Sequence, residues 1–135
     1  MPSLRRYDLF ISHAWAHNDD YYRLVGFLNE APNFLWRNLS VPEHDPITKP
    51  NLEYELRAQM RDAHAFIVLG GMYVAHSEWI DFEISFARRT GRPILGIRPW
   101  GSERLPAVLE AAADEIVGWN SASIVAGIRR WALPA

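Results

Sequence analysis

The chain has 135 residues, a formal net charge of −2 and no cysteine. This length suits one self-sufficient core, and the absence of cysteine excludes a disulfide framework, a thiolate zinc site and a cysteine nucleophile. The charge balance offers no basic face for DNA or RNA, so we expect no nucleic-acid partner. No segment approaches the roughly 18 apolar residues of a membrane span, and the N-terminus lacks the apolar stretch of a signal peptide, so we expect a cytoplasmic protein without membrane contact.

Five short apolar runs predict β-strands. They are rich in β-branched or aromatic residues, as buried strands require. The second run is the weakest and is expected at the margin of a sheet. The predicted strands are 7–12, 34–39, 65–69, 93–97 and 115–119.

Longer stretches with helical spacing separate the strands. Asn18, Asp19 and Asp20 offer capping oxygens for the first helix, and Pro50 and Asn51 open the second. Ser77 can cap the third, which runs to about Thr90. Two more helices are predicted over 104–113 and 121–133.

This alternation predicts an α/β protein with a flavodoxin-like, doubly wound, five-stranded parallel sheet of order 2-1-3-4-5 and helices on both faces. We expect residues 1–135 to form one domain with its core at about 5–133. In such a sheet, ligands bind outside the carboxyl ends of strands one and three, where the winding reverses. The loops after Ser12 and Leu69 should therefore border a ligand site.

The third predicted helix carries an unusual acid. At about 100° per residue, Ile80, Ile84 and Ala87 define its core face. Glu83 falls on the flank of that face, next to Trp79. A carboxylate beside apolar surface is costly without partners and is enriched at functional sites. Two interpretations stay open, a functional carboxylate or an ion pair at the helix margin with a base such as Arg88 or Arg57.

The loop after the first strand contains His13, Trp15 and His17. The two histidines lie four apart in a loop without a third ligand at metal-site spacing, so no metal site is expected. Trp15 is a candidate for stacking on a ligand ring, whereas core packing is the preferred interpretation of Trp36.

Several other functions of this fold class are excluded by missing residues. A phospho-acceptor domain needs an Asp after strand three and a Lys after strand five, but these positions hold Leu69 with two glycines and Trp119, and the one lysine is Lys49. The loop after strand one is a poor flavin phosphate loop, and no P-loop, GxGxxG or GxSxG is present.

From Arg5 to Leu133 the chain resembles a known family. YDLFISHAW, the loop SVPEHDPI, AFIVLGGMYVAHSEWIDFEI and GRPILGI are similar to the Toll/interleukin-1 receptor (TIR) domain, and most of all to the TIR-like proteins of bacterial Thoeris anti-phage defence. The most specific part is the pattern Tyr73, Ser77, Trp79, Glu83, which matches the motif carrying the catalytic glutamate of TIR enzymes. The loop departs from the receptor-type signature, which favours the Thoeris type.

This resemblance implies consumption of NAD+ as a substrate, with no cofactor, and Glu83 as the catalytic residue. It further implies cleavage of the nicotinamide–ribose bond and an ADP-ribose-derived, cyclic second messenger that activates a separate effector protein. A homo-oligomer that completes the site between protomers, with contacts through 41–49, is also implied. The residues expected to bind NAD+ are Ser12, His13, Trp15, Asp45, Tyr73 and Trp79.

Two further classes stay open. A non-catalytic TIR self-association module would assemble with concentration and leave NAD+ intact. An enzyme similar to nucleoside deoxyribosyltransferases, which share the fold class and use a glutamate on N-glycosides, would exchange nucleoside bases and ignore NAD+. The chemistry of the site has to discriminate them, because the fold alone does not.

Overall fold

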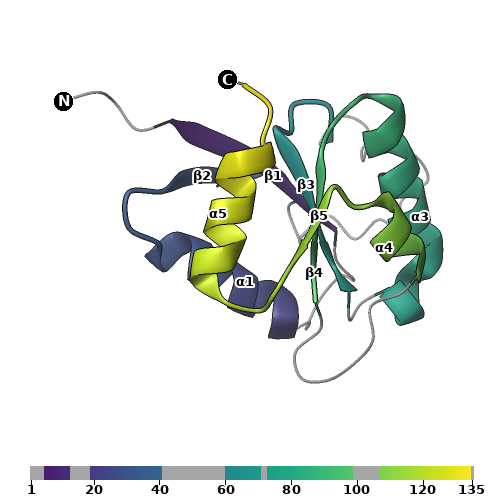
Figure 1. The fold of residues 1–135 in the computed structure, drawn as a ribbon, viewed down its shortest axis with the longest axis horizontal. Helices are drawn as coiled ribbons and strands as arrows, with labels where there is room; N and C mark the ends of the chain where they lie inside the picture. The colour runs from purple at the N-terminus through teal and green to yellow at the C-terminus, as the bar shows by residue number, and fades with distance from the viewer. Residues whose placement is uncertain (1–4, 13–18, 41–59, 71–72, 99–106, 135) are drawn as a thin grey trace.

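The computed structural model describes residues 5–12, 19–40, 60–70, 73–98 and 107–134, with the backbone alone for Ser12 and for residues 73–80. Its centre is a sheet of five parallel strands, the arrows of Figure 1. The strands are β1 (Arg6–Ser12), β2 (Leu35–Asn38), β3 (Ala65–Leu69), β4 (Ile94–Ile97) and β5 (Glu115–Val117).

The strands are ordered β2-β1-β3-β4-β5, which confirms the predicted flavodoxin-like topology. The winding reverses between β1 and β3, since β2 lies beyond β1 while β4 and β5 lie beyond β3. In register, Ser12 pairs with Val68, and Leu69 pairs with Ile97. The strand ends therefore meet at one end of the sheet, which we call the carboxyl end. The amino end is the opposite one, where β1 begins at Arg6 and α5 (Ser121–Trp131) ends (Figure 1).

Helices cover both faces of this sheet. They are α1 (Asp19–Glu30), α3 (Tyr73–Arg89), α4 (Ala107–Ala112) and α5 (Ser121–Trp131). Figure 1 shows α1 and α5 on one side of the sheet and α3 and α4 on the other. The packing agrees with this view, because Gly127 of α5 lies against Leu95, whereas Gly96, the next residue of β4, faces Leu109 of α4. Because successive residues of a strand face opposite sides of the sheet, β4 contacts both helix layers.

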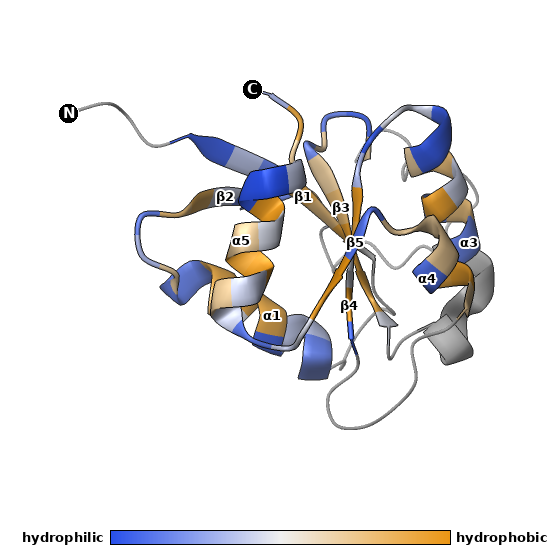
Figure 2. Ribbon diagram, in the orientation of Figure 1, coloured by the Kyte–Doolittle hydropathy of each residue, from blue (hydrophilic) through white to orange (hydrophobic). Residues whose placement is uncertain are grey.

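The core lies between the sheet and these helices. All five residues of β3 are buried, and Figure 2 shows the hydrophobic colour concentrated in the strands and on the inward sides of the helices. Phe66 of β3 contacts two other rings, with ring centroids 5.3 Å from Phe10 and 6.4 Å from Phe86. Burial of each such side chain contributes about 1.5 to 3 kcal/mol to folding, so β3 anchors both layers.

The predicted elements within the described residues match the observed ones to within one residue at most boundaries, and three boundaries differ by more. α3 begins at Tyr73, so Ser77 is not its N-cap. The intervening residues include neither Gly nor Pro, and the helix extends through them because this adds a turn of backbone hydrogen bonds. The last strand ends at Val117 rather than 119, and α5 ends at Trp131 rather than 133. The helix ends early because Leu133 precedes a proline, which disfavours the helical conformation at Leu133.

The start of α5 shows how local chemistry sets a boundary. Asn120 has extended backbone angles, and its side chain accepts a hydrogen bond from the backbone N–H of Ser123 at 2.8 Å. This is an N-cap, which satisfies a donor that the first turn leaves unpaired. The predicted helix that opens at Pro50 and the predicted start at Arg104 lie outside the described residues.

Candidate functional site

The carboxyl end of the sheet contains the strand ends at which the ligand site is expected. β1 ends at Ser12 and β3 at Leu69, on the two strands between which the winding reverses. Buried Gly70 follows β3, and α3 begins at Tyr73. Crossover connections diverge at such a point, and ligands of doubly wound sheets bind there.

Glu83 lies on α3 beside the carboxyl-terminal half of β3. Phe86, which follows it by three residues, stacks on Phe66. The offset of three positions from Phe86 to Glu83 corresponds to about 4.5 Å along the helix axis, and α3 runs antiparallel to β3. Glu83 is therefore placed near the level of Val68, the strand residue that pairs with Ser12.

The Glu83 side chain is buried as deeply as the core. It is 5% exposed, the same fraction as its neighbour Ile84, and its Oε2 atom is shielded from solvent. Ile84 and Ala87 are buried, which confirms the predicted core face at two of its three positions, since the side chain of Ile80 is not described; Asp81 on the same helix is exposed. Helical spacing predicted Glu83 on the flank of this face, and the structure places it inside.

A buried carboxylate in such a position has chemical consequences. Transfer of a charged group from water to apolar surroundings is costly, and a charge in a region of low dielectric acts more strongly on a neighbouring charge than it would in water. Glu83 is therefore suited to stabilise positive charge that develops on a bound ligand.

The structure places only part of the predicted substrate-binding set. Ser12 is the last residue of β1 and Tyr73 the first of α3, so the backbone brings both to the carboxyl end. Trp79 precedes Glu83 by about one helical turn on α3. The other predicted members, His13, Trp15 and Asp45, lie outside the described residues, as does Arg57.

One buried polar residue at this end was missed by sequence analysis. Ser40 follows β2 and is 0% exposed. The sequence signal that could have identified this residue is a pair of polar residues, Asn38 and Ser40, near the end of a predicted strand. Tyr21 was assigned only to the apolar stripe of the first helix, and its hydroxyl proves to face both of them.

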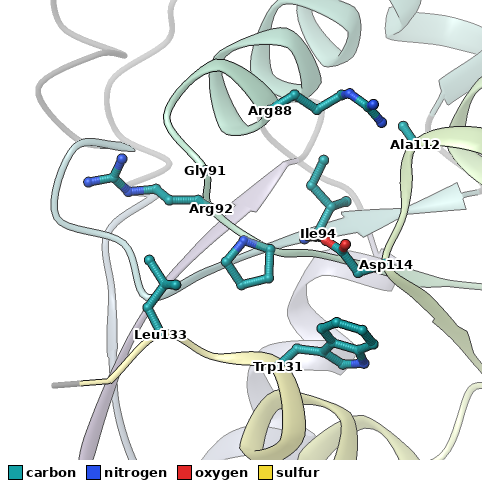
Figure 3. Close-up of a pocket in the computed structure, with 9 residues that line it drawn as sticks. Arg88, Gly91, Arg92, Ile94, Ala112, Asp114, Trp131 and Leu133 are labelled. Carbon is teal, nitrogen blue, oxygen red and sulfur yellow. Dashed lines mark hydrogen bonds between the residues drawn. The ribbon is translucent and has the colours of Figure 1, made fainter.

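A cavity of about 430 Å³ lies at the amino end, away from Glu83. It is bordered by Arg88 at the end of α3, Trp131 at the end of α5 and Ile94 at the start of β4. Figure 3 shows Arg88 and Trp131 on opposite sides of it. The C-termini of α3 and α5 converge here, at the opposite end of the sheet from Ser12 and Leu69. This cavity is therefore separate from the candidate site.

Neither a metal-binding cluster nor a membrane-spanning helix is found in the part of the chain that the structure describes. There, no group of three histidine, aspartate or glutamate side chains is arranged to hold a metal ion. None of the helices in that part is both long and apolar enough to traverse a lipid bilayer.

One known protein family matches most of this chain. The family model described as "Thoeris protein ThsB, TIR-like domain" matches residues 10–104. The match runs from within β1 through β4 and includes the whole of α3, and hence Glu83. No curated protein matches the sequence.

Proposed function

Because the chain belongs to the family of Thoeris ThsB TIR-like domains, a defence-related TIR module, we propose that it cleaves NAD+ between nicotinamide and ribose. The observation that carries this proposal is the burial of Glu83 in α3, near the carboxyl ends of β1 and β3. An acid held there at a cost in solvation suggests a role beyond folding.

The proposed reaction needs one carboxylate. The bond from ribose C1′ to the nicotinamide nitrogen breaks, and its electron pair leaves with neutral nicotinamide, so a strong general acid is not required. Positive charge develops over C1′ and the ring oxygen in an oxocarbenium-like state. Glu83 stabilises this charge and orients the ribose hydroxyls, and its low-dielectric surroundings strengthen the interaction.

The fate of the ribosyl group depends on which nucleophile reaches C1′. Water would give ADP-ribose, whereas an adenine nitrogen or a ribose hydroxyl of the same molecule would give a cyclic product. Cyclisation requires that water be excluded until the internal nucleophile attacks. We propose the cyclic outcome, with the product acting in the cytoplasm as a messenger for a separate effector protein.

The remaining roles are proposed from position. Ser12 and His13 would contact ribose or phosphate, Trp15 or Tyr73 would stack on a ring of the dinucleotide, and Asp45 and Trp79 would complete the binding site. A homo-oligomer would bring a second protomer to the site through residues 41–49.

The chain offers a matched pair of variants to test Glu83. Glu83→Gln removes the charge with little change of shape, and Asp81→Asn makes the same change at an exposed position two residues away on α3. Removal of a group that stabilises transition-state charge should lower nicotinamide release about 100-fold or more. Asp81→Asn should stay within about twofold of the wild type, as expected for a surface substitution. Equal activity of Glu83→Gln and Asp81→Asn would disprove the catalytic assignment.

One observation favours a second candidate, a non-catalytic self-association module. Large apolar side chains are exposed on several elements: Tyr22, Leu35, Val108 and Trp131. This module would show mass that rises with concentration in light scattering while NAD+ remains intact.

A further inference from the structure

Ser40 is held on every polar atom by its neighbours. Its backbone N–H and its hydroxyl both donate to Oδ1 of Asn38, at 3.0 and 2.6 Å. Its carbonyl accepts from the hydroxyl of Tyr21 at 3.1 Å, and the same hydroxyl accepts from Nδ2 of Asn38 at 2.7 Å. Tyr21, Asn38 and Ser40 therefore form a closed ring, which we call the Ser40 ring.

The donors and acceptors of this ring match without conflict. The single proton of each hydroxyl has one acceptor, the Tyr21 proton on the Ser40 carbonyl and the Ser40 proton on Asn38. The Asn38 amide can take only one orientation, because its oxygen receives two donors and its nitrogen supplies one. A fully satisfied buried network of this kind fixes geometry and leaves little freedom for alternatives.

The Ser40 ring also extends the sheet beyond the end of β2. The backbone N–H of Leu39 still donates to the carbonyl of Leu9 at 2.9 Å. Two residues further along β1, the N–H of Ile11 donates to Oγ of Ser40 at 3.3 Å. A side chain thus contributes an acceptor to the backbone of β1, immediately before Ser12.

We propose that Tyr21, Asn38 and Ser40 are positioning residues for substrate binding, acting through the end of β1. They hold Ile11, and with it the position of Ser12, relative to β2 and α1. This inference rests on the proposed function, in which the end of β1 contacts the ribose or phosphate of NAD+. Because that contact exists before the reaction begins, loosening it raises KM and leaves kcat nearly unchanged.

Tyr21→Phe tests this inference with a minimal change. It removes one oxygen from a side chain that is 3% exposed, so the packing of α1 is kept. The matched control is Tyr22→Phe, the same chemical change on the adjacent tyrosine, which is 54% exposed. We expect KM for NAD+ to rise about fivefold in Tyr21→Phe, the scale of one lost hydrogen bond. Tyr22→Phe should match the wild type.

A second variant separates positioning from general destabilisation. Ser40→Ala removes the acceptor of the Ile11 amide, and Asn120→Ala removes the N-cap of α5, which is a loss of similar size elsewhere. Thermal melts should show comparable destabilisation of both. Only Ser40→Ala should raise KM, and only Ser40→Ala should speed hydrogen exchange at the Ile11 amide.

The outcomes of these measurements are distinct. A raised KM with unchanged kcat in Tyr21→Phe and Ser40→Ala supports positioning. Kinetic constants equal to those of Tyr22→Phe and Asn120→Ala, or a loss confined to kcat, would overturn it while the proposed function stands. Absence of NAD+ cleavage by the wild-type protein would overturn both.

Discussion

The two ends of the sheet are built from different chemistry. At the amino end, charged side chains secure the backbone and one another. Asp8 forms ion pairs of 3.0 Å with both Arg6 and Arg37, and Asp114 accepts from the N–H of Ile94 at 2.7 Å. At the carboxyl end, the neutral Ser40 ring secures the strands, and a second buried acid, Glu83, lies on the adjacent helix α3.

We infer from this difference that residues at the amino end stabilise the fold, whereas residues near the carboxyl end act on the substrate. Asp8 at the amino end is also buried, but it pairs with two arginines whose side chains are about half exposed, so its removal should alter folding and little else. Glu83 is buried on the helix next to the strand ends where ligands of such sheets bind. A buried acid at such a position is a candidate for a functional residue. Variants at the two ends should therefore affect different measured quantities.

The largest effect on stability is expected in β3, the fully buried strand in the middle of the sheet. Phe66→Ala removes a ring that is 1% exposed and contacts Phe10 and Phe86. The lost burial and the resulting cavity should lower the free energy of unfolding by about 3 to 5 kcal/mol. Urea denaturation followed by circular dichroism measures it, and a loss of less than about 1 kcal/mol would contradict the core described above.

A smaller effect is expected for Asp8→Ala at the amino end. Arg6 and Arg37 have side chains 56% and 46% exposed, so both can be hydrated after the change. The free energy of unfolding should fall by about 1 to 2 kcal/mol. Under conditions where the variant is folded, kcat/KM should equal the wild-type value. A selective loss of kcat/KM would contradict the assignment of Asp8 to stability alone.

Asp114→Ala should have a still smaller effect. This variant leaves the N–H of Ile94 without its carboxylate acceptor and should lower the free energy of unfolding by about 1 kcal/mol. The same denaturation measurement applies, with Glu110→Ala on the exposed side of α4 as the control. Equal stability of the two variants would show that the Asp114 contact contributes nothing.

The smallest effect is a pH dependence at the amino end. Burial, reinforced by the charges of Arg5, Arg6 and Arg37 and opposed by Asp8, lowers the pKa of His64 below its usual 6.5. Its Nδ1 accepts from the N–H of Asp8 at 2.9 Å, which requires the deprotonated ring nitrogen. The unfolded chain therefore binds the proton more readily, so this contribution to stability is complete above the usual pKa and declines as the pH falls through the lower folded value.

Denaturation at about pH 7.5 and about pH 5.5, on either side of the ordinary histidine pKa, tests this dependence. His64→Asn keeps an acceptor near the position of Nδ1 but does not titrate in this range. We expect the difference in unfolding free energy between the two pH values to shrink in this variant. An unchanged difference would assign the pH dependence to other groups.

The sequence was sufficient for the topology and for one candidate site residue. Apolar runs located the strands, and the parallel order followed from the alternation of strands and helices. Glu83 was recognisable as an acid next to the apolar stripe of its helix. The full burial of Glu83 could not be predicted, because helical spacing gives only the angle of a residue around the helix axis. It does not give the depth of the layers packed against that residue.

The Ser40 ring was beyond sequence analysis for a different reason. Asn38 and Ser40 are two residues apart, but Tyr21 joins them only because α1 folds back along the sheet. Tyr21 has the spacing of a core residue, and its ring is indeed buried. Which polar atom its hydroxyl meets depends on tertiary packing. The start of α3 was misplaced because Ser77 is compatible with both a cap and a helix interior.

The most direct test of the central claim is mass-resolved chromatography of NAD+ incubated with the wild-type protein. It should be run at low and high protein concentration, with and without lysate from phage-infected cells. We predict release of nicotinamide together with an equimolar ADP-ribose-derived product whose mass distinguishes cyclisation from hydrolysis. Intact NAD+ under every condition would contradict the enzymatic account and favour the self-association module.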